Sequence, residues 1–186
     1  MRAVFLDRDG VINENRSDYV RSWDEVVFLP GVFESLRKLA GTTYRVIVVS
    51  NQSAINRGLV TVETVEDIHR QMRQVVEEQD GRIDAFVYCP HRPDEGCDCR
   101  KPKAGMLLEA AQRFSLELPR CYLIGDALSD VRAARAAGCL PILVQTGRGR
   151  ESMGLARGPE GDALVVVEDL SAAVDWILAR GEDSPA

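Results

Sequence analysis

Apolar segments with the composition of strands alternate along the chain with segments of helical period. The strand candidates lie at about 2–7, 45–50, 83–88, 121–125, 141–144 and 164–167, and the helical segments at about 31–40, 61–80, 104–115, 129–138 and 170–180. Parallel strands need crossover connections, which are usually helices, so this alternation predicts a parallel sheet with helices on both of its faces. The chain is therefore expected to be an α/β protein.

The length of the chain fits one folded domain. A chain of 186 residues can bury a full hydrophobic core without disulfides or metals to support it. We expect one domain over 1–181 and a flexible polar tail over 182–186. The Gly- and Arg-rich stretch at 147–161 is expected to form a mobile loop with solvated arginines.

The charge and hydropathy of the chain exclude two classes of partner. The formal net charge is −6, the isoelectric point is about 5.0, and no run of Lys or Arg could follow a nucleic-acid backbone. No apolar stretch approaches the roughly 18 residues of a membrane span, and the N-terminus begins with a strand pattern in place of a signal sequence. We expect a cytoplasmic monomer that binds neither nucleic acid nor membrane.

Two carboxylates, Asp7 and Asp9, end the first apolar segment and are followed by a glycine. Ligands of open α/β sheets bind outside the carboxyl ends of the strands, so both side chains are expected at a binding site. Two carboxylates this close repel each other, and a site that keeps both needs a cation or a raised pKa on one of them. Oxygen ligands of this kind suit Mg²⁺.

Polar residues also follow the next three strand candidates. Ser50, Asn51 and Gln52 come after the second, Arg100 and Lys101 after the third, and Gly125 with Asp126 after the fourth. These strand ends converge in a parallel sheet. A cluster of carboxylates with a hydroxyl and a lysine supplies what metal-assisted phosphoryl transfer requires: a nucleophile, a proton donor, a cation and groups that bind the phosphoryl oxygens.

The order of these motifs resembles the haloacid dehalogenase superfamily of phosphatases, which use an aspartate nucleophile. The matching elements are DRD at 7–9, Ser50, Lys101 and GDALSD at 125–130. The resemblance implies a Rossmann-like fold in which Asp7 attacks phosphorus to form an aspartyl-phosphate. Asp9 is then implied to act first as general acid toward the leaving alkoxide and next as general base toward water.

The same resemblance implies how the remaining site residues act. Mg²⁺ would bind a carboxylate oxygen of Asp7, the backbone carbonyl of Asp9 and the side chain of Asp126. Ser50 and Lys101 would hold the phosphoryl oxygens. Asp130 is implied to touch the metal through water or to orient other groups.

Each of these motifs has a structural alternative when it is taken alone. Asp and Gly are favoured in turns, so the Asp-x-Asp-Gly segment at 7–10 could be a turn after a strand. Ser50 could cap a helix, and Asp130 could be an acidic residue near a helix N-terminus. The occurrence of all the motifs in order, each at a strand end, favours the catalytic interpretation.

A second cluster of ligand residues lies at 89–102 and predicts a structural zinc loop. Cys89, His91, Cys97 and Cys99 can supply four ligands to a tetrahedral Zn²⁺, which leaves no open position for chemistry. The alternative is a set of buried thiols with an unrelated histidine. Zinc would cross-link the loop that carries the adjacent Arg100 and Lys101. Cys121 and Cys139 are expected to be core thiols, and His69 a surface or core residue.

Short intervals between the motifs leave little room for an inserted cap domain, so a nearly capless enzyme is expected. Within the superfamily, two phosphatase families share a zinc loop followed by CRKP. One hydrolyses the 7-phosphate of D-glycero-D-manno-heptose 1,7-bisphosphate, and the other hydrolyses histidinol phosphate. The segments SNQSAINRG at 50–58 and KPKAGM at 101–106 resemble the heptose family. Arg57 and Arg100 suit a substrate with a second phosphate.

The resemblance implies a set of contacts with a small phosphorylated sugar. They are Asn15, Arg16, Ser17, Asp18, Asn51, Gln52, Ser53, Arg57 and Arg100. Ala127 departs from the pattern, because some family members place a lysine there. Besides histidinol-phosphate phosphatase, a general sugar or acid phosphatase stays open as an alternative. A receiver-like phosphate-binding module and a zinc-dependent interaction domain are the alternatives outside the enzymes.

Overall fold

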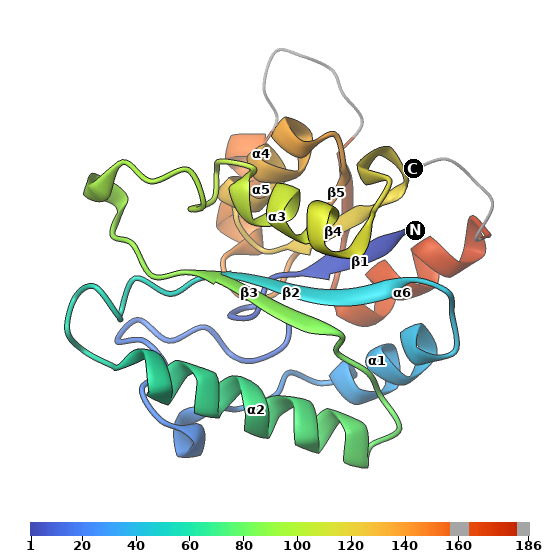
Figure 1. The fold of residues 1–186 in the computed structure, drawn as a ribbon. Coiled ribbons are helices and arrows are strands. Elements are labelled where there is room, and N and C mark those ends of the chain that lie inside the picture. The colour runs from blue at the N-terminus through green and yellow to red at the C-terminus, as the bar shows by residue number, and fades with distance from the viewer. Residues whose placement is uncertain (157–163, 182–186) are drawn as a thin grey trace.

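The computed structural model of the chain describes residues 1–156 and 164–181 and contains a six-stranded parallel sheet (Figure 1). The strands are β1 (Ala3–Leu6), β2 (Arg45–Asn51), β3 (Ala85–Cys89), β4 (Tyr122–Gly125), β5 (Leu140–Val144) and β6 (Val165–Val167). Their order across the sheet is β3-β2-β1-β4-β5-β6, and every pairing is parallel. The predicted Rossmann-like α/β fold is therefore confirmed.

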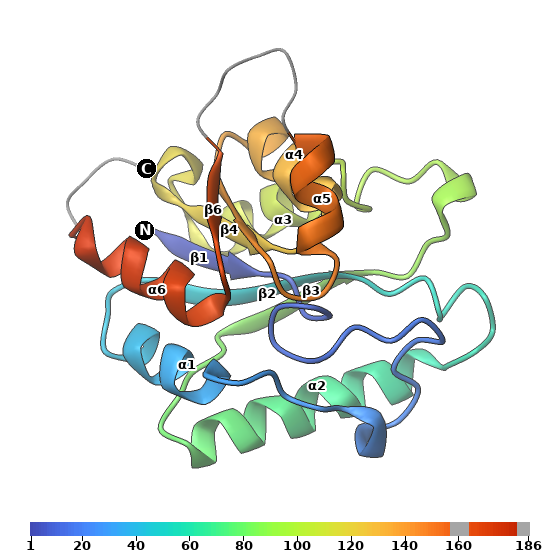
Figure 2. The same cartoon turned by 180° about the vertical axis from the view of Figure 1, so that it is seen from behind.

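Helices cover both faces of this sheet (Figures 1 and 2). They are α1 (Val32–Ala40), α2 (Val62–Glu78), α3 (Gly105–Phe114), α4 (Leu128–Ala137), α5 (Gly149–Ala156) and α6 (Leu170–Ala179). The first two and α6 lie on one face, and α3 and α4 lie on the other, with α5 beside α4. The sequence also determines where α2 begins. The Thr61 hydroxyl accepts a hydrogen bond from the backbone N–H of Thr64 and so caps the N-terminus of this helix.

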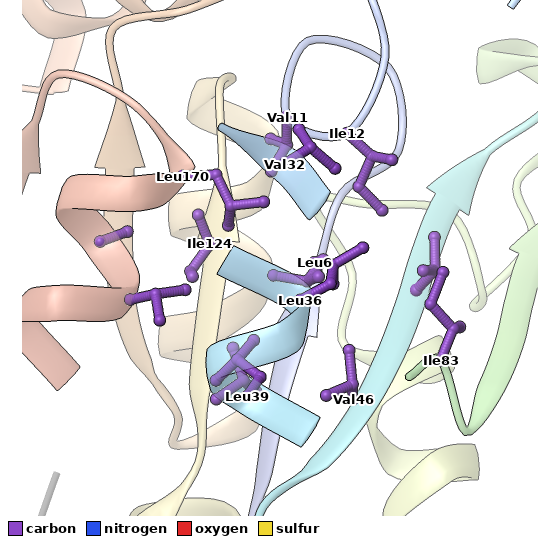
Figure 3. Close-up of a cluster of buried hydrophobic side chains, with 14 of the residues drawn as sticks. Leu6, Val11, Ile12, Val32, Leu36, Leu39, Val46, Ile83, Ile124 and Leu170 are labelled. Carbon is purple, nitrogen blue, oxygen red and sulfur yellow. The ribbon is translucent and has the colours of Figure 1, made fainter. Parts of the chain in front are cut away.

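Each face of the sheet has its own hydrophobic core. Figure 3 shows the core beneath α1 and α6, where Leu6 and Ile124 from the sheet meet Leu36, Leu39 and Leu170 from the helices. The opposite face packs Phe5 and Ile47 against residues of α3 and α4. Alternate residues of β1 thus enter opposite cores, which is why this short strand is apolar throughout.

The sequence prediction was wrong for the start of the stretch at 147–161. Part of it forms the helix α5 (Gly149–Ala156) and not a loop. Arg148 and Arg150 are exposed, as expected. The rest of the predicted loop, at 157–163, and the predicted tail at 182–186 lie outside the described residues.

The connections on the side where the polar motifs lie hold loops and single helices. β1 leads to α1 through a loop with a three-residue 3₁₀ turn, η1 (Trp23–Glu25), and only α2 separates β2 from β3. The described residues therefore contain no cap domain in these intervals. No helix within the described ranges is long and apolar enough to cross a membrane.

Candidate active site

A cleft of about 290 Å³ lies at the carboxyl ends of the strands. Its lining contains all of the predicted catalytic, magnesium and substrate residues except two, Asp18 and Asp130. β1 lies between β2 and β4, so residues that follow these three strands reach the same space. Sheet order, and not proximity in sequence, brings them together.

Asp7 follows β1 directly and is surrounded by charged groups. Its Oδ1 lies 2.9 Å from Nζ of Lys101 and accepts a hydrogen bond of 2.7 Å from the backbone N–H of Arg8. Burial raises the pKa of Asp7 to about 8, and nearby carboxylates add to the rise, although Lys101 opposes it. The site therefore needs further positive charge before this carboxyl can be an anionic nucleophile near neutral pH.

Lys101 is buried and held by three oxygens. Its Nζ donates to the carbonyl of Val49 at 2.8 Å and forms ion pairs with Asp7 at 2.9 Å and with Oδ1 of Asp130 at 2.7 Å. Burial alone would lower the pKa of Lys101, but the two carboxylates raise it above its usual range, so the ammonium stays charged. Asp130 is fixed in turn, because its Oδ2 accepts from the backbone N–H of Ala127 at 3.0 Å.

Asp7, Asp126 and Asp130 each offer a carboxylate oxygen, and these oxygens lie within 4.8 Å of one another. Burial and the charge of Asp130 raise the pKa of Asp126 to about 6, although the backbone N–H of Arg148, 2.8 Å from its Oδ2, opposes the rise. Three buried carboxylates with one lysine carry an excess of negative charge. Oxygen donors in this arrangement fit a hard divalent cation such as Mg²⁺.

Two glycines make room for the Asp126 carboxylate. A Cβ atom added to Gly10 or to Gly147 would lie 2.1 Å from its Oδ2, and both glycines have positive φ, of 91° and 54°. The hydroxyl of Thr146 donates to the carbonyl of Gly10 at 2.6 Å and ties the two loops together. Glycine at these positions is therefore required by a close approach and not only by a turn.

Asp9 is held by donors on both of its oxygens. Oδ1 accepts from Nη2 of Arg8 at 3.0 Å and from Nδ2 of Asn13 at 2.9 Å, while Oδ2 accepts from Nε of Arg8 at 3.1 Å and from Nε2 of Gln52 at 3.0 Å. Burial favours the neutral carboxyl, but Arg8 and these hydrogen bonds outweigh it and hold the pKa of Asp9 below its usual value.

Ser50 and Asn51 at the end of β2, and Gln52 directly after it, contact different neighbours. The Ser50 hydroxyl lies at the cleft and accepts from Nε2 of Gln52 at 2.7 Å. The amide of Asn51 pairs with the backbone of Lys101: its Oδ1 accepts from the N–H and its Nδ2 donates to the carbonyl, both at 3.1 Å. The amides of Asn51 and Gln52 thus bind other site residues. Both residues also line the cleft, and their contact with substrate stays a prediction.

Arginines surround the mouth of the cleft. Arg16 pairs with Asp18 at 3.0 Å, and Asp18 itself points away from the lining toward Arg21 at 3.1 Å. Arg57 and Arg100 line the cleft, and neither forms an ion pair with a carboxylate among the described residues. Nη1 of Arg100 donates to the carbonyl of His91 at 3.0 Å, which leaves its other donors and the guanidinium of Arg57 for an anionic ligand.

Sequence reasoning missed Arg8, Tyr19, Ser129 and Arg148, which also line the cleft. Arg148 follows β5, so the rule that found the other motifs would have found it if applied to that strand as well. Tyr19 adopts a positive φ of 67° in the loop after β1, and no local pattern signals its position.

The predicted zinc ligands converge at the loop after β3. The Sγ atom of Cys89 lies 3.6 Å from Sγ of Cys97 and 3.1 Å from Sγ of Cys99, and Nδ1 of His91 lies 3.4 and 3.2 Å from Cys89 and Cys99. Zn–S bonds of about 2.3 Å place tetrahedral ligands about 3.5–3.8 Å apart. The observed distances are near this spacing and mostly somewhat shorter, and all four ligand atoms lie within 4.8 Å of one another. The donor set therefore fits a zinc ion, with protein in all four ligand positions.

Three comparisons with known proteins agree with this geometry. Residues 98–173 match a family model described as HAD-hydrolase-like. The D-glycero-beta-D-manno-heptose-1,7-bisphosphate 7-phosphatase of Pseudomonas aeruginosa is 41% identical over 94% of this chain and 97% of its own length. The enzyme of the same name from Bordetella bronchiseptica is 40% identical over 96% of this chain and 98% of its own.

A solved structure is similar over nearly the whole chain. It is the crystal structure of D,D-heptose 1,7-bisphosphate phosphatase from Bordetella bronchiseptica, complexed with magnesium and phosphate. It matches with a TM-score of 0.91 and 40% identity, and covers 97% of this chain and 100% of that one.

Proposed function

Since the chain belongs to the heptose-1,7-bisphosphate 7-phosphatase family of HAD-like hydrolases, we propose that it removes the 7-phosphate of D-glycero-D-manno-heptose 1,7-bisphosphate. The proposal is supported most directly by the placement of Asp7 between Lys101 and the carboxylate of Asp126, next to a second carboxylate, Asp9. This arrangement offers a nucleophile, a proton carrier and cationic groups for the phosphoryl oxygens.

In the first half-reaction a carboxylate oxygen of Asp7 attacks phosphorus and the bond from phosphorus to the sugar oxygen breaks. The leaving oxygen takes a proton from Asp9. Four hydrogen bonds favour the ionised form of Asp9. The proton that Asp9 donates in this step is returned in the second half-reaction, when Asp9 accepts a proton from water, so the number of protons on the site is unchanged over one turnover.

In the second half-reaction water attacks the phosphorus of the aspartyl-phosphate and Asp9 accepts its proton. The bond between phosphorus and Asp7 breaks, inorganic phosphate leaves, and the Asp7 carboxylate is restored. Ser50 and Lys101 would donate to the phosphoryl oxygens in both steps. Loss of one such donor typically costs about 2.7–4 kcal/mol of transition-state stabilisation.

Two metal ions fit the donor sets, with different tasks. Asp7, Asp126 and the backbone carbonyl of Asp9 would hold Mg²⁺, which supplies positive charge that offsets repulsion between an anionic nucleophile and an anionic phosphate. Cys89, His91, Cys97 and Cys99 would hold a structural zinc ion.

The charge of the cleft mouth favours a bisphosphate over histidinol phosphate. Arg57 and Arg100 line the cleft without a carboxylate partner among the described residues, and a guanidinium group binds phosphate with two parallel hydrogen bonds. Histidinol phosphate would instead bring a cationic end toward them. We infer that these two arginines bind the phosphate that is not hydrolysed.

The proposal is tested by comparing kcat/KM for heptose 1,7-bisphosphate and for histidinol phosphate with Mg²⁺ present. We expect release of the 7-phosphate, with the 1-phosphate retained in the product by ³¹P NMR, and a preference for the bisphosphate of at least tenfold. Asp7→Asn should abolish turnover while keeping the zinc content and the circular dichroism spectrum. Turnover by that variant, or a preference for histidinol phosphate, would contradict the proposal.

A further inference from the structure

A chain of polar side chains runs from Asp9 at the cleft through Arg8 to His69 on α2. Behind the Asp9 carboxylate lies the guanidinium of Arg8, whose residue is only 1% exposed, and behind Arg8 lies the imidazole of His69 on α2. An arginine this deeply buried needs a partner for each of its donor groups. The partners of Arg8 show what it is built to hold.

Most donors of Arg8 are directed at the Asp9 carboxylate and its support. Nε and Nη2 contact the two oxygens of Asp9 at 3.1 and 3.0 Å, and Nη2 also donates to Oε1 of Gln52 at 3.2 Å. The remaining nitrogen, Nη1, lies 3.4 Å from Nε2 of His69. His69 therefore contacts the side of the guanidinium that faces away from Asp9.

His69 acts as an acceptor in this contact. A guanidinium group can only donate, so Nε2 of His69 must carry the lone pair and the ring must be the neutral tautomer with its proton on Nδ1. Burial and the neighbouring Arg8 lower the pKa of His69 to about 3, which agrees with a neutral ring. The ring is fixed by stacking on Phe86, with centroids 4.4 Å apart and planes 10° apart.

A neutral acceptor suits this position better than a carboxylate would. A second anion beside Arg8 would compete with Asp9 for the guanidinium, whereas the imidazole satisfies Nη1 and leaves the positive charge directed at Asp9. The contact therefore fixes the plane of the guanidinium, and the guanidinium fixes the plane of the Asp9 carboxylate.

We propose that Arg8 and His69 are positioning residues that orient Asp9 to accept the proton of the water that hydrolyses the aspartyl-phosphate. The proposal rests on the function proposed above, because it assigns a task within that two-step reaction. Neither residue has to touch the substrate. Displacement of a catalytic group by about 1 Å from a distant change can cost roughly 10²-fold in rate.

The choice of substrate isolates this step. p-Nitrophenyl phosphate releases a phenolate that needs little help from a general acid, so formation of the phosphoenzyme does not depend on Asp9 for this substrate. Hydrolysis of the phosphoenzyme still does. If Asp9 loses its orientation, kcat for p-nitrophenyl phosphate should therefore fall while kcat/KM stays nearly unchanged. The reason is that kcat/KM reports only the steps up to phosphoenzyme formation.

The experiment uses the Mg²⁺-loaded full chain and compares His69→Leu, which removes the acceptor, with His69→Gln, which keeps a neutral one. For His69→Leu we expect kcat and the measured decay rate of the ³²P-labelled phosphoenzyme to fall together by roughly 10–100-fold, with kcat/KM within about threefold of wild type. His69→Gln should stay within about threefold in all of these quantities. His69→Gln is therefore the matched control, because it changes the same position of α2 and keeps a neutral acceptor.

Equal falls of kcat and kcat/KM with an unchanged decay rate would show a purely structural role and overturn the proposal. A decay in His69→Gln as slow as that in His69→Leu would also overturn it. If His69→Leu does not fold, Arg8→Lys tests the proposal in its place. Lysine cannot contact both oxygens of Asp9, so we expect the same slow decay of the phosphoenzyme. Failure of the proposed function looks different: the wild type would then leave heptose 1,7-bisphosphate intact.

Discussion

At the scale of single residues, the geometry around Asp126 shows how tightly backbone and carboxylate are packed in this site. Gly10 and Gly147 approach its Oδ2 so closely that neither can carry a side chain without moving it. Asp126 is the one expected magnesium ligand supplied by the loop after β4. Its position should therefore depend on both glycines, and the metal affinity should depend on its position.

Gly10→Ala is expected to weaken Mg²⁺ binding by at least tenfold, because the added Cβ would lie 2.1 Å from Oδ2 of Asp126. It should also destabilise the protein by about 1–3 kcal/mol, since Gly10 has a φ of 91°. Gly138→Ala is the control: its φ is 79°, but no atom lies within 4 Å of the new Cβ. Calorimetric Mg²⁺ titration and urea unfolding of both variants check this, and equal Mg²⁺ affinities would contradict the explanation.

The sequence predicted which residues meet in the cleft better than it predicted what each one contacts. Asp7 and Asp126 could be found because each directly follows a strand, Ser50 because it lies near the end of β2, and Lys101 because the loop after β3 carries it. The contacts of the Gln52 amide could not be predicted in this way. Two of its partners, Arg8 and Asp9, lie in the loop after β1, and tertiary packing decides whether the amide contacts protein or substrate.

At the scale of elements, the cysteine-histidine loop connects β3 to the lysine of the cleft. Cys99 lies two residues before Lys101, and the backbone of Lys101 is fixed from the other side by the Asn51 amide at the end of β2. The loop is thus held between a proposed metal and a strand end. Loss of the metal or of the Asn51 contact should therefore displace the buried ammonium group of Lys101.

Removal of the proposed zinc ion should inactivate the enzyme even when Mg²⁺ is saturating. We expect kcat to fall by roughly 10²-fold, because the donor Lys101 is displaced, and the melting temperature to fall as well. Chelation followed by addition of Zn²⁺ or of Mg²⁺ alone distinguishes the two ions. Recovery with Mg²⁺ alone would show that the loop does not depend on zinc.

The predicted helices and strands agree with the structure where hydrophobic period is strong, and the exception is α5. Its sequence, GRESMGLA, has two glycines and little apolar period, so local propensity argues against a helix. The position of α5 is set instead by tertiary packing. Gly149 lies so close to the carbonyl of Val144 that a side chain at residue 149 would overlap it. Packing against β5 therefore places this helix, and sequence patterns do not report it.

At the scale of the whole molecule, the buried carboxylates connect stability to pH and to the metal. In the metal-free protein the pKa values of Asp7 and Asp126 are raised from 3.8 to about 8 and about 6. The folded state therefore holds protons that the unfolded chain has already lost. Stability from these groups is highest below about pH 4 and falls as pH rises toward 8.

Mg²⁺ should reverse this loss, since binding displaces the same protons. We expect the increase in unfolding free energy caused by a fixed concentration of Mg²⁺ to be larger at pH 8 than at pH 5. Urea unfolding at both pH values, with and without Mg²⁺, measures the difference directly. Asp126→Asn should reduce the pH dependence. A Mg²⁺ effect that is the same at both pH values would contradict the assignment of these carboxylates to the metal.

The position of β1 in the middle of the sheet has a consequence for how the protein is made. β1 ends at Leu6, but its partner β4 begins only at Tyr122, and the two pair along their whole shared edge. During synthesis on the ribosome, the edge of β1 that pairs with β4 stays unpaired until most of the chain has emerged. The other edge can pair with β2 early. Phosphatase activity should therefore appear late in translation, because Asp126 arrives with β4, and the exposed edge of β1 is where a nascent chain would need a chaperone.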